Sequence, residues 1–271
     1  MSTAPTLYPA AQPLSPTRSL AAIFLKETKY EFLKLLRTRT FSFSVIGFPV
    51  MFYLLFGVAN RTSFDGNVHV AKAMLGGYAC FGLIGAALFG IGVGMAAEIN
   101  AGWLEVKRAS PMPPLAYLVA KLMTAVAFGL IVVAILIAIG VTLGGVSITA
   151  SEIARMLALT SVGAVVFACM GLLIAQIVPA NSAPGIVNLI YLPMSFVSGL
   201  WMPFRYLPHW VQKVAPIMPT YHLAQLMLRI FGPGYYLTNA SVQTHWFGLI
   251  GFGCLTLGAS WAVFNRTQRN S

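Results

Sequence analysis

Few residues in this sequence could carry out chemistry on a bound molecule. The 271 residues include 6 acidic side chains, and the only aspartate is Asp65. A P-loop ATPase needs a phosphate-binding lysine within GxxxxGK[ST], and the sequence contains no Gly-Lys pair. The HExxH and GxSxG patterns of zinc and serine hydrolases are absent as well. We therefore expect no catalytic residue and no ATP hydrolysis by this chain.

The histidines and cysteines show no metal-binding spacing. The four histidines are far apart: His69, His209, His222 and His245. Interfacial anchoring or solvent exposure explains them better than metal ligation. The three cysteines are also far apart, in apolar stretches without a CxxC pair: Cys80, Cys169 and Cys254. We expect buried, unpaired thiols, and neither a metal site nor a bound cofactor.

The most polar stretch between the apolar segments is 98–114, EINAGWLEVKRASPMPP. Ile99, Trp103 and Val106 are spaced to share one face of a short helix. The charged residues around that face are Glu98, Glu105 and Arg108. Such a helix, held at a membrane surface, can transmit force to a docked protein. A solvated loop that only connects two apolar segments fits the pattern equally well.

The composition places the elements that surround this stretch in a membrane. Hydrophobic residues make up 58% of the chain, charged residues make up 8%, and the mean hydropathy is +0.80. A soluble domain carries roughly 25% charged residues. The net charge of +11 would fit a nucleic-acid binder only if the cations were clustered on one exposed face, and here they separate apolar blocks.

The apolar blocks predict six transmembrane helices. A helix of about 20 residues crosses a bilayer core. The longest charge-free run, 156–204, is too long for one crossing, and Pro179 and Pro184 within 178–185 divide it into two helices. The expected spans are 41–59, 73–97, 116–143, 153–177, 185–203 and 245–264.

Positive charge predicts the orientation of these spans. Eleven of the 17 Lys and Arg residues fall in the N-terminal segment, the alternate connections and the C-terminal tail. Because short cytoplasmic segments retain Lys and Arg, we expect both termini in the cytoplasm. The chain is then a multi-pass protein of the cell membrane, which we expect to be a bacterial inner membrane.

An amphipathic helix is expected before the first span. On a helical wheel, the apolar side chains of 19–40 fall on one side, and Lys26, Lys34, Arg37 and Glu31 fall on the other. Such a helix lies in the membrane interface with its cations at anionic headgroups. A helix that packs on a partner protein is the alternative. The preceding residues 1–18 are rich in proline and are expected to be disordered.

Two stretches resemble one known family, the type-2 ABC exporter permeases. The first resembles the family signature E…GTLE..R.SP…Y…K, and its matching residues are Glu98, 102–105, 108–111, Tyr117 and Lys121. The second resembles the fifth span of that family and the loop after it, and it covers 192–204, Leu207, Pro208, Trp210 and 215–221. Departures from the pattern are Trp103, Lys107 and Met218. The resemblance extends over nearly the whole chain after Ser19.

The resemblance implies an all-α membrane protein with six transmembrane helices, the N-terminal interfacial helix, a cytoplasmic coupling helix and outer re-entrant half-helices after the fifth span. Residues 41–265 would form the permease domain, and 266–271 a cytoplasmic tail. Two separate ABC ATPase subunits would bind ATP and magnesium, and a second permease protomer would complete a homodimer along the first and fifth spans. The implied ATPase-coupling residues are Glu98, Gly102, Trp103, Glu105, Arg108 and Pro111.

The cargo route is less well defined by the sequence. Candidate outer-gate residues lie where glycine and proline interrupt the segment after the fifth span: Gly199, Pro203 and Pro208. Candidate path residues are uncharged and polar or aromatic: Tyr78, Asn188, Tyr191, Ser195 and Ser198. Hydrogen bonding between helices explains these side chains better than lining of a path. The low charge would suit an amphiphilic or apolar cargo such as a drug, a lipid or a glycolipid, and a polysaccharide is also compatible.

Two classes of function remain open. The first is the permease subunit of an ATP-driven exporter, and the second is a membrane scaffold or assembly factor with the same fold. A channel or proton-coupled carrier fits less well, because the second to sixth spans contain almost no ionisable residue at mid-depth.

Overall fold

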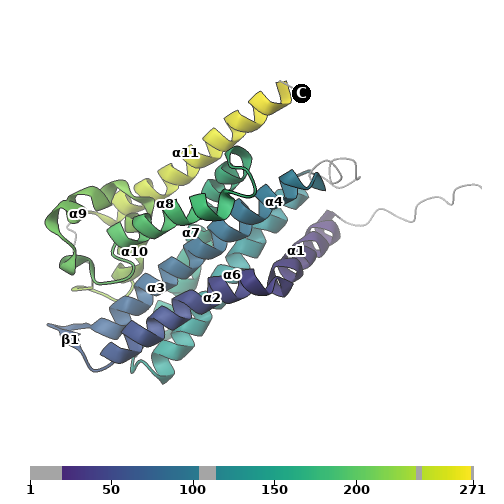
Figure 1. Ribbon diagram of the computed structural model, residues 1–271. Coiled ribbons are helices and arrows are strands. Elements are labelled where there is room, and N and C mark those ends of the chain that lie inside the picture. The colour runs from purple at the N-terminus through teal and green to yellow at the C-terminus, as the bar shows by residue number, and fades with distance from the viewer. Residues whose placement is uncertain (1–19, 104–113, 236–239, 270–271) are drawn as a thin grey trace, which may run out of the picture.

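The computed structural model describes residues 20–103, 114–235 and 240–269 of the chain, and most of them are helical (Figure 1). The first half comprises α1 (Leu20–Arg37), α2 (Arg39–Phe52), the π-helix η1 (Tyr53–Gly57), the 3₁₀-helix η2 (Val58–Asn60), β1 (Phe64–Asp65), β2 (Val68–His69), α3 (Val70–Ala87), the π-helix η3 (Leu88–Val93) and α4 (Gly94–Asn100). The second half comprises α6 (Pro114–Thr142), α7 (Ala150–Ile177), α8 (Ala183–Val197), η4 (Phe204–Tyr206), α9 (His209–Val214), η5 (Ala215–Ile217), α10 (Pro219–Arg229) and α11 (Val242–Arg269).

The long helices run between two ends of the molecule (Figure 1). We call one end the Glu98 end; it contains α1, α4, the start of α6 and the C-terminal part of α11. We call the other the Asp65 end; it contains the antiparallel β1–β2 hairpin, η4, α9 and the start of α10. Each end therefore gathers segments that are far apart in the sequence.

Five helical segments in the described residues are long and apolar enough to cross a membrane: Arg39–Asn60, Val70–Asn100, Leu115–Thr142, Ala150–Ile177 and Val242–Arg266. They correspond to five of the six expected spans. The expected span at 185–203 corresponds to α8, which has 15 residues and is shorter than the roughly 20 that cross a bilayer core. The helix ends early because the chain turns at Gly199, whose φ is +72°. The break expected at 178–185 separates α7 from α8.

The segment formed by α3, η3 and α4 lies at the centre of the molecule. Along the most apolar stretch of this segment, 83% of the residues are buried. Along the most apolar stretch of the first span, and likewise of the last, only 22% of the residues are buried. Small residues permit this close packing. At Gly77, for example, a Cβ would lie 2.4 Å from the carbonyl oxygen of Leu200.

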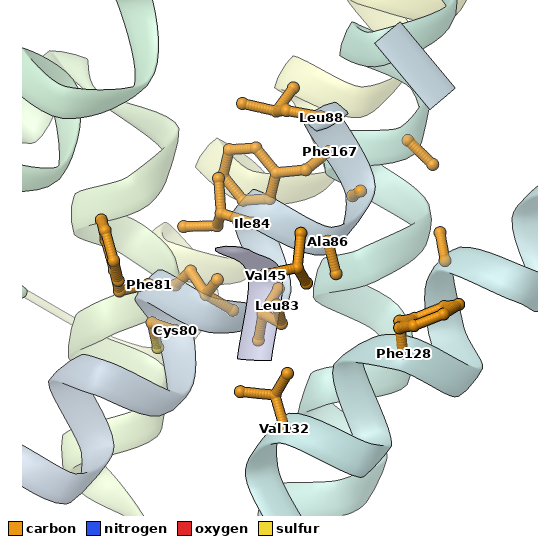
Figure 2. Packing of buried hydrophobic residues seen from close by; sticks show 14 of the residues in the cluster. Val45, Cys80, Phe81, Leu83, Ile84, Ala86, Leu88, Phe128, Val132 and Phe167 are labelled. Carbon is orange, nitrogen blue, oxygen red and sulfur yellow. The ribbon is translucent and has the colours of Figure 1, made fainter. Parts of the chain in front are cut away.

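The apolar core forms around this central segment (Figure 2). Buried side chains of α3, including Leu83 and Ile84, pack with Phe128 and Val132 of α6 and with Phe167 of α7. The rings of Phe32 on α1 and Phe41 on α2 each lie 5.1 Å from that of Phe128. These contacts join the two N-terminal helices to the helical bundle.

The structure corrects two details predicted from the sequence. Glu31 was placed on the polar side of the N-terminal helix, but it is buried, because α1 packs on α6 along a face that combines Glu31 with Leu35. Apolar residues such as Leu25 are instead exposed. Cys80 and Cys169 are buried as expected, whereas Cys254 on α11 is exposed.

Candidate functional site

A buried group of charged residues joins three helices at the Glu98 end. Lys121 on α6 has 1% of its side chain exposed, and its Nζ donates to carboxylates of Glu31 on α1 and of Glu98 on α4. The Lys121 Nζ to Glu98 Oε1 distance is 2.7 Å. The Tyr117 hydroxyl donates to Glu98 Oε2 at 2.5 Å. The Lys34 ammonium also binds Glu98 and lies 3.9 Å from Glu31.

We call Glu31, Lys34, Glu98, Tyr117 and Lys121 the Lys121 cluster. Its two lysines balance its two glutamates, which makes burial of the charges tolerable. Tyr117 and Lys121 are spaced i, i+4 on α6, so both reach the same carboxylate of α4. Removing Lys121 or one of the two glutamates would leave an uncompensated charge in a buried position. The cluster therefore favours movement of α1, α4 and the start of α6 as one unit.

Some of the expected coupling residues lie where the chain leaves this cluster. α4 ends at Asn100, and the chain turns at Ala101 and Gly102, where Gly102 has a φ of +72°. That value suits glycine, in agreement with the expected tight turn. Trp103 follows and is 56% exposed. The turn separates Ile99 from Trp103, so the two are not on one continuous helix. Glu105, Arg108 and Pro111 lie outside the described residues.

Two residues of the expected sites have partners within this chain. Glu98 was expected at a contact with another protein, but it is 8% exposed and its carboxylate is bound by groups of this chain. Lys34 was expected at lipid headgroups; its side chain is half exposed, yet its ammonium binds Glu98. Lys26 and Arg37, the other two expected surface cations, are exposed on α1.

Sequence reasoning placed Glu98, Tyr117 and Lys121 in one family signature but did not predict that they meet. It also missed Glu31 as a partner. One available signal was the position of Lys121, two turns inside an otherwise charge-free helix. A lysine there needs a counterion, because an unpaired buried charge is costly. The identity of the counterion depends on packing between helices, which a helical wheel does not contain.

Most of the expected path residues bond to other parts of the chain. Tyr78 donates to the Trp201 carbonyl at 3.0 Å, and Tyr191 donates to the Phe81 carbonyl at 2.6 Å. The Ser198 hydroxyl lies 2.5 Å from that of Thr220. These three side chains match the alternative of hydrogen bonding within the bundle.

The other two expected path residues differ in exposure. Ser195 is buried, and its hydroxyl has no hydrogen-bond partner within the described residues. Asn188 is exposed on α8. Only Asn188 is therefore presented on the surface of a single chain.

At the Asp65 end, the expected gate residues border a cluster of ionic contacts. Gly199 follows the end of α8, Pro203 precedes η4, and Pro208 precedes α9. Asp65 Oδ2 lies 2.5 Å from Arg205 Nη1 and accepts a hydrogen bond from the Tyr206 hydroxyl at 2.8 Å. The hydrogen bond that the Tyr206 hydroxyl donates to the Asp65 carboxylate raises the pKa of Tyr206. The contacts attach the β1–β2 hairpin to η4.

A second ion pair at this end joins regular helices. Lys72 Nζ on α3 donates to Glu152 Oε1 on α7 at 2.7 Å, and both side chains are largely buried. Glu152 also forms a capping box with Thr149 at the start of α7. This pair fixes the starts of α3 and α7 against each other.

Two histidines that the sequence did not pair meet between α10 and α11. The Nδ1 atoms of His222 and His245 are 3.0 Å apart, so the N–H of one ring donates a hydrogen bond to the nitrogen of the other. His245 is buried, and Gly248 leaves room for the His222 ring, because a Cβ there would lie 2.4 Å from it. Burial lowers the pKa of His222.

Two comparisons with known proteins bear on this geometry. Residues 24–232 match the sequence profile described as "ABC-2 type transporter". The chain is also similar to the "Putative transport permease YvfS" of Bacillus subtilis (strain 168), with 24% identity over 201 residues. That alignment covers 74% of this chain and 82% of the Bacillus protein. The profile match includes both the Lys121 cluster and the contact between Asp65 and Arg205.

Proposed function

This chain belongs to the ABC-2 type transporter family, and from that premise we propose that it is the permease subunit of an ATP-driven exporter. Family membership makes the chain a multi-pass membrane subunit of an ABC transporter, and it implies an ABC ATPase as partner. It also indicates a non-catalytic subunit. We propose that ATP and magnesium bind to that partner, since the sequence has no P-loop.

The Lys121 cluster is the observation that carries this proposal. It binds α4 to α1 and α6 directly before the 101–114 segment, which is where the family resemblance places the coupling helix. Closure of two ATPase subunits would push this segment. Because separation of the buried charges is costly, the push would move three helices together rather than bend one connection. The bundle would then shift between inward-facing and outward-facing states.

We propose a homodimer with two ATPase subunits beneath it at the Glu98 end, which faces the cytoplasm in this arrangement together with both termini. The seam would lie along α2 and α8. Their exposed faces are strongly apolar, with Phe43 80% exposed and Leu189 70% exposed. With α8 as a short fifth span, the count of six crossings holds, and η4, α9 and α10 would be outer half-helices. Lys26 and Arg37 would contact anionic lipid headgroups.

An amphiphilic or apolar cargo fits this arrangement best. Most polar path candidates are occupied by hydrogen bonds within the chain, so a single protomer presents little polar lining. Asn188 is the exposed exception, and it lies on α8 beside the proposed seam. A drug, a lipid or a glycolipid would therefore pass between two protomers, along surfaces that are mainly apolar.

The test is reconstitution. The chain is purified with its partner ABC ATPase, identified by co-purification, and inserted into liposomes that contain an amphiphilic dye or a fluorescent phospholipid analogue. We expect ATP-dependent movement of at least one probe across the bilayer, and faster ATP hydrolysis by the ATPase when this chain is present. A complex that hydrolyses ATP but moves neither probe would favour the alternative of a membrane scaffold or assembly factor.

A further inference from the structure

We propose that Asp65, Arg205 and Tyr206 form a latch that keeps the Asp65 end closed and must open in each transport cycle. The inference rests on the proposed transport function but concerns a different end of the molecule from the Lys121 cluster. The latch joins the β1–β2 hairpin to η4, although these elements are about 140 residues apart in sequence.

The two contacts of the latch converge on a single oxygen atom. Asp65 Oδ2 lies 2.5 Å from Arg205 Nη1 and 2.8 Å from the Tyr206 hydroxyl. Asp65 is the only aspartate in the chain. One carboxylate thus holds both η4 residues, and removing its charge would weaken the two contacts together.

The latch is better suited to opening than the neighbouring ion pair. The side chains of Arg205 and Asp65 are 29% and 32% exposed, whereas those of Lys72 and Glu152 are 12% and 10% exposed. Water can replace the partners of exposed charges, so such pairs separate easily. The latch also joins two short elements, a hairpin with two residues in each strand and a single 3₁₀ turn. Lys72 and Glu152 instead join the starts of two long helices.

The latch covers a small pocket between the hairpin, η4 and α10. Asp65 and Arg205 line the pocket together with Gly77, Gly199, Gln225 and Tyr235. Gln225 is 1% exposed, and its Oε1 has no hydrogen-bond partner within the part of the chain that the structure describes. Buried polar atoms are nearly always hydrogen-bonded, so this acceptor indicates a position that receives water or a ligand group when the pocket opens.

The pocket is small while the latch is closed. Its volume of about 30 Å³ is far below the roughly 300–1,000 Å³ of pockets that bind drug-sized molecules. An amphiphilic cargo cannot occupy it while the latch is closed. Separation of the hairpin from η4 removes one wall, and the chain can bend at Gly199, which already has a positive φ of +72°.

Labelling of a cysteine in the pocket tests the latch without any transport. Gln225→Cys is introduced with Cys254→Ser, so that the two remaining native thiols, Cys80 and Cys169, are buried. In lipid nanodiscs, Asp65→Asn should increase the rate of maleimide labelling at position 225 at least threefold. The exchanged pair Asp65→Arg with Arg205→Asp should return it toward the starting rate. Labelling of Ser241→Cys, an exposed control at the start of α11, should not change. An unchanged rate at position 225 in Asp65→Asn would overturn the latch.

Cross-linking tests its role in transport. Asp65→Cys and Arg205→Cys are joined by a short bifunctional methanethiosulfonate, which a reducing agent releases. ATP-driven movement of the amphiphilic dye or the fluorescent phospholipid should fall at least tenfold after cross-linking and recover after reduction. Full transport by the cross-linked protein would contradict the latch. If the wild-type protein also moves neither probe, the proposed exporter function is contradicted, and the labelling experiment alone decides for or against the latch.

Discussion

Four of the six acidic side chains form ion pairs between different elements. Asp65, Glu31, Glu98 and Glu152 each bind a cation from a different helix or loop, two of them at each end of the molecule. Ion pairs that are buried need complete compensation, whereas exposed pairs contribute little to stability. The ion pairs of these four carboxylates therefore differ in strength according to burial, and those of the Lys121 cluster are the most costly to break.

The first prediction concerns Lys121→Met. The substitution keeps the length of the side chain but leaves Glu31 and Glu98 with less compensation, so we expect a loss of about 3–5 kcal/mol in stability. Thermal unfolding in detergent measures this loss, and Lys29→Met on the exposed part of α1 serves as control. Combining Lys121→Met with Glu31→Gln and Glu98→Gln should restore much of the stability but not the stimulation of the ATPase. Normal stimulation by the triple variant would exclude a coupling role for the cluster.

The second prediction concerns pH and the pair His222–His245. Burial lowers the pKa of His222 in the folded protein below its unfolded value of 6.5. A depressed histidine pKa means that folding favours the neutral ring, so this contribution to stability is complete above pH 6.5 and is lost as the pH falls through the folded pKa. Protonation of the accepting Nδ1 would also place two N–H donors 3.0 Å apart.

The melting temperature of the purified protein should therefore decrease below pH 6.5. His222→Gln, which does not titrate, should reduce this decrease, and His209→Gln at the exposed start of α9 should leave it unchanged. The same pH profile in the wild type and in His222→Gln would contradict the assignment.

At the scale of elements, the sequence was a good guide to where helices begin and end. Five expected spans match long helices closely, because each apolar run is bounded by charged or turn-forming residues such as Arg39 and Asn100. The expected span at 185–203 was too long, because the apolar run continues beyond the turn at Gly199. Hydropathy does not detect that turn, since glycine lies between apolar residues there.

Other features of the elements depend on contacts that periodicity does not contain. The helical wheel of α1 grouped Glu31 with the lysines, but the approach of α6 brought a counterion to that face and buried it. The pairing of His222 with His245 likewise depends on how α10 meets α11. These partners are determined by tertiary packing. A single sequence could therefore identify the residues but could not show which of them pair.

The third prediction tests the close packing of the central helix. Gly77→Ala would place a Cβ 2.4 Å from the backbone oxygen of Leu200, and backbone cannot move away as easily as a side chain. We expect a loss of about 1–3 kcal/mol in stability. Gly251→Ala on α11 meets no atom within 4 Å and should be neutral or stabilising by up to about 1 kcal/mol. Equal melting temperatures for the two variants would show that α3 is less tightly held than described.

At the scale of the whole molecule, the two ends have different chemistry. The Glu98 end contains a buried, neutralised cluster that joins helices into one unit, and the Asp65 end contains a partly exposed contact between two short elements. The rigid Glu98 end is suited to transmit force from an ATPase. The Asp65 end, whose contact can separate, is suited to release the cargo. We propose that ATP-driven movement of the ATPase is transmitted to the Glu98 end and opens the Asp65 end.

The central claim is that an ABC ATPase docks at the Glu98 end, and photo-cross-linking tests it without knowledge of the cargo. Trp103 and Trp210 are both exposed, at 56% and 68%, and lie at opposite ends of the molecule. Each is replaced in turn by benzoylphenylalanine, and the complex with the ATPase is irradiated in membranes. We expect a covalent product with the ATPase from position 103 and none from position 210. A product from position 210 alone, or from neither position while the ATPase still co-purifies, would contradict the central claim.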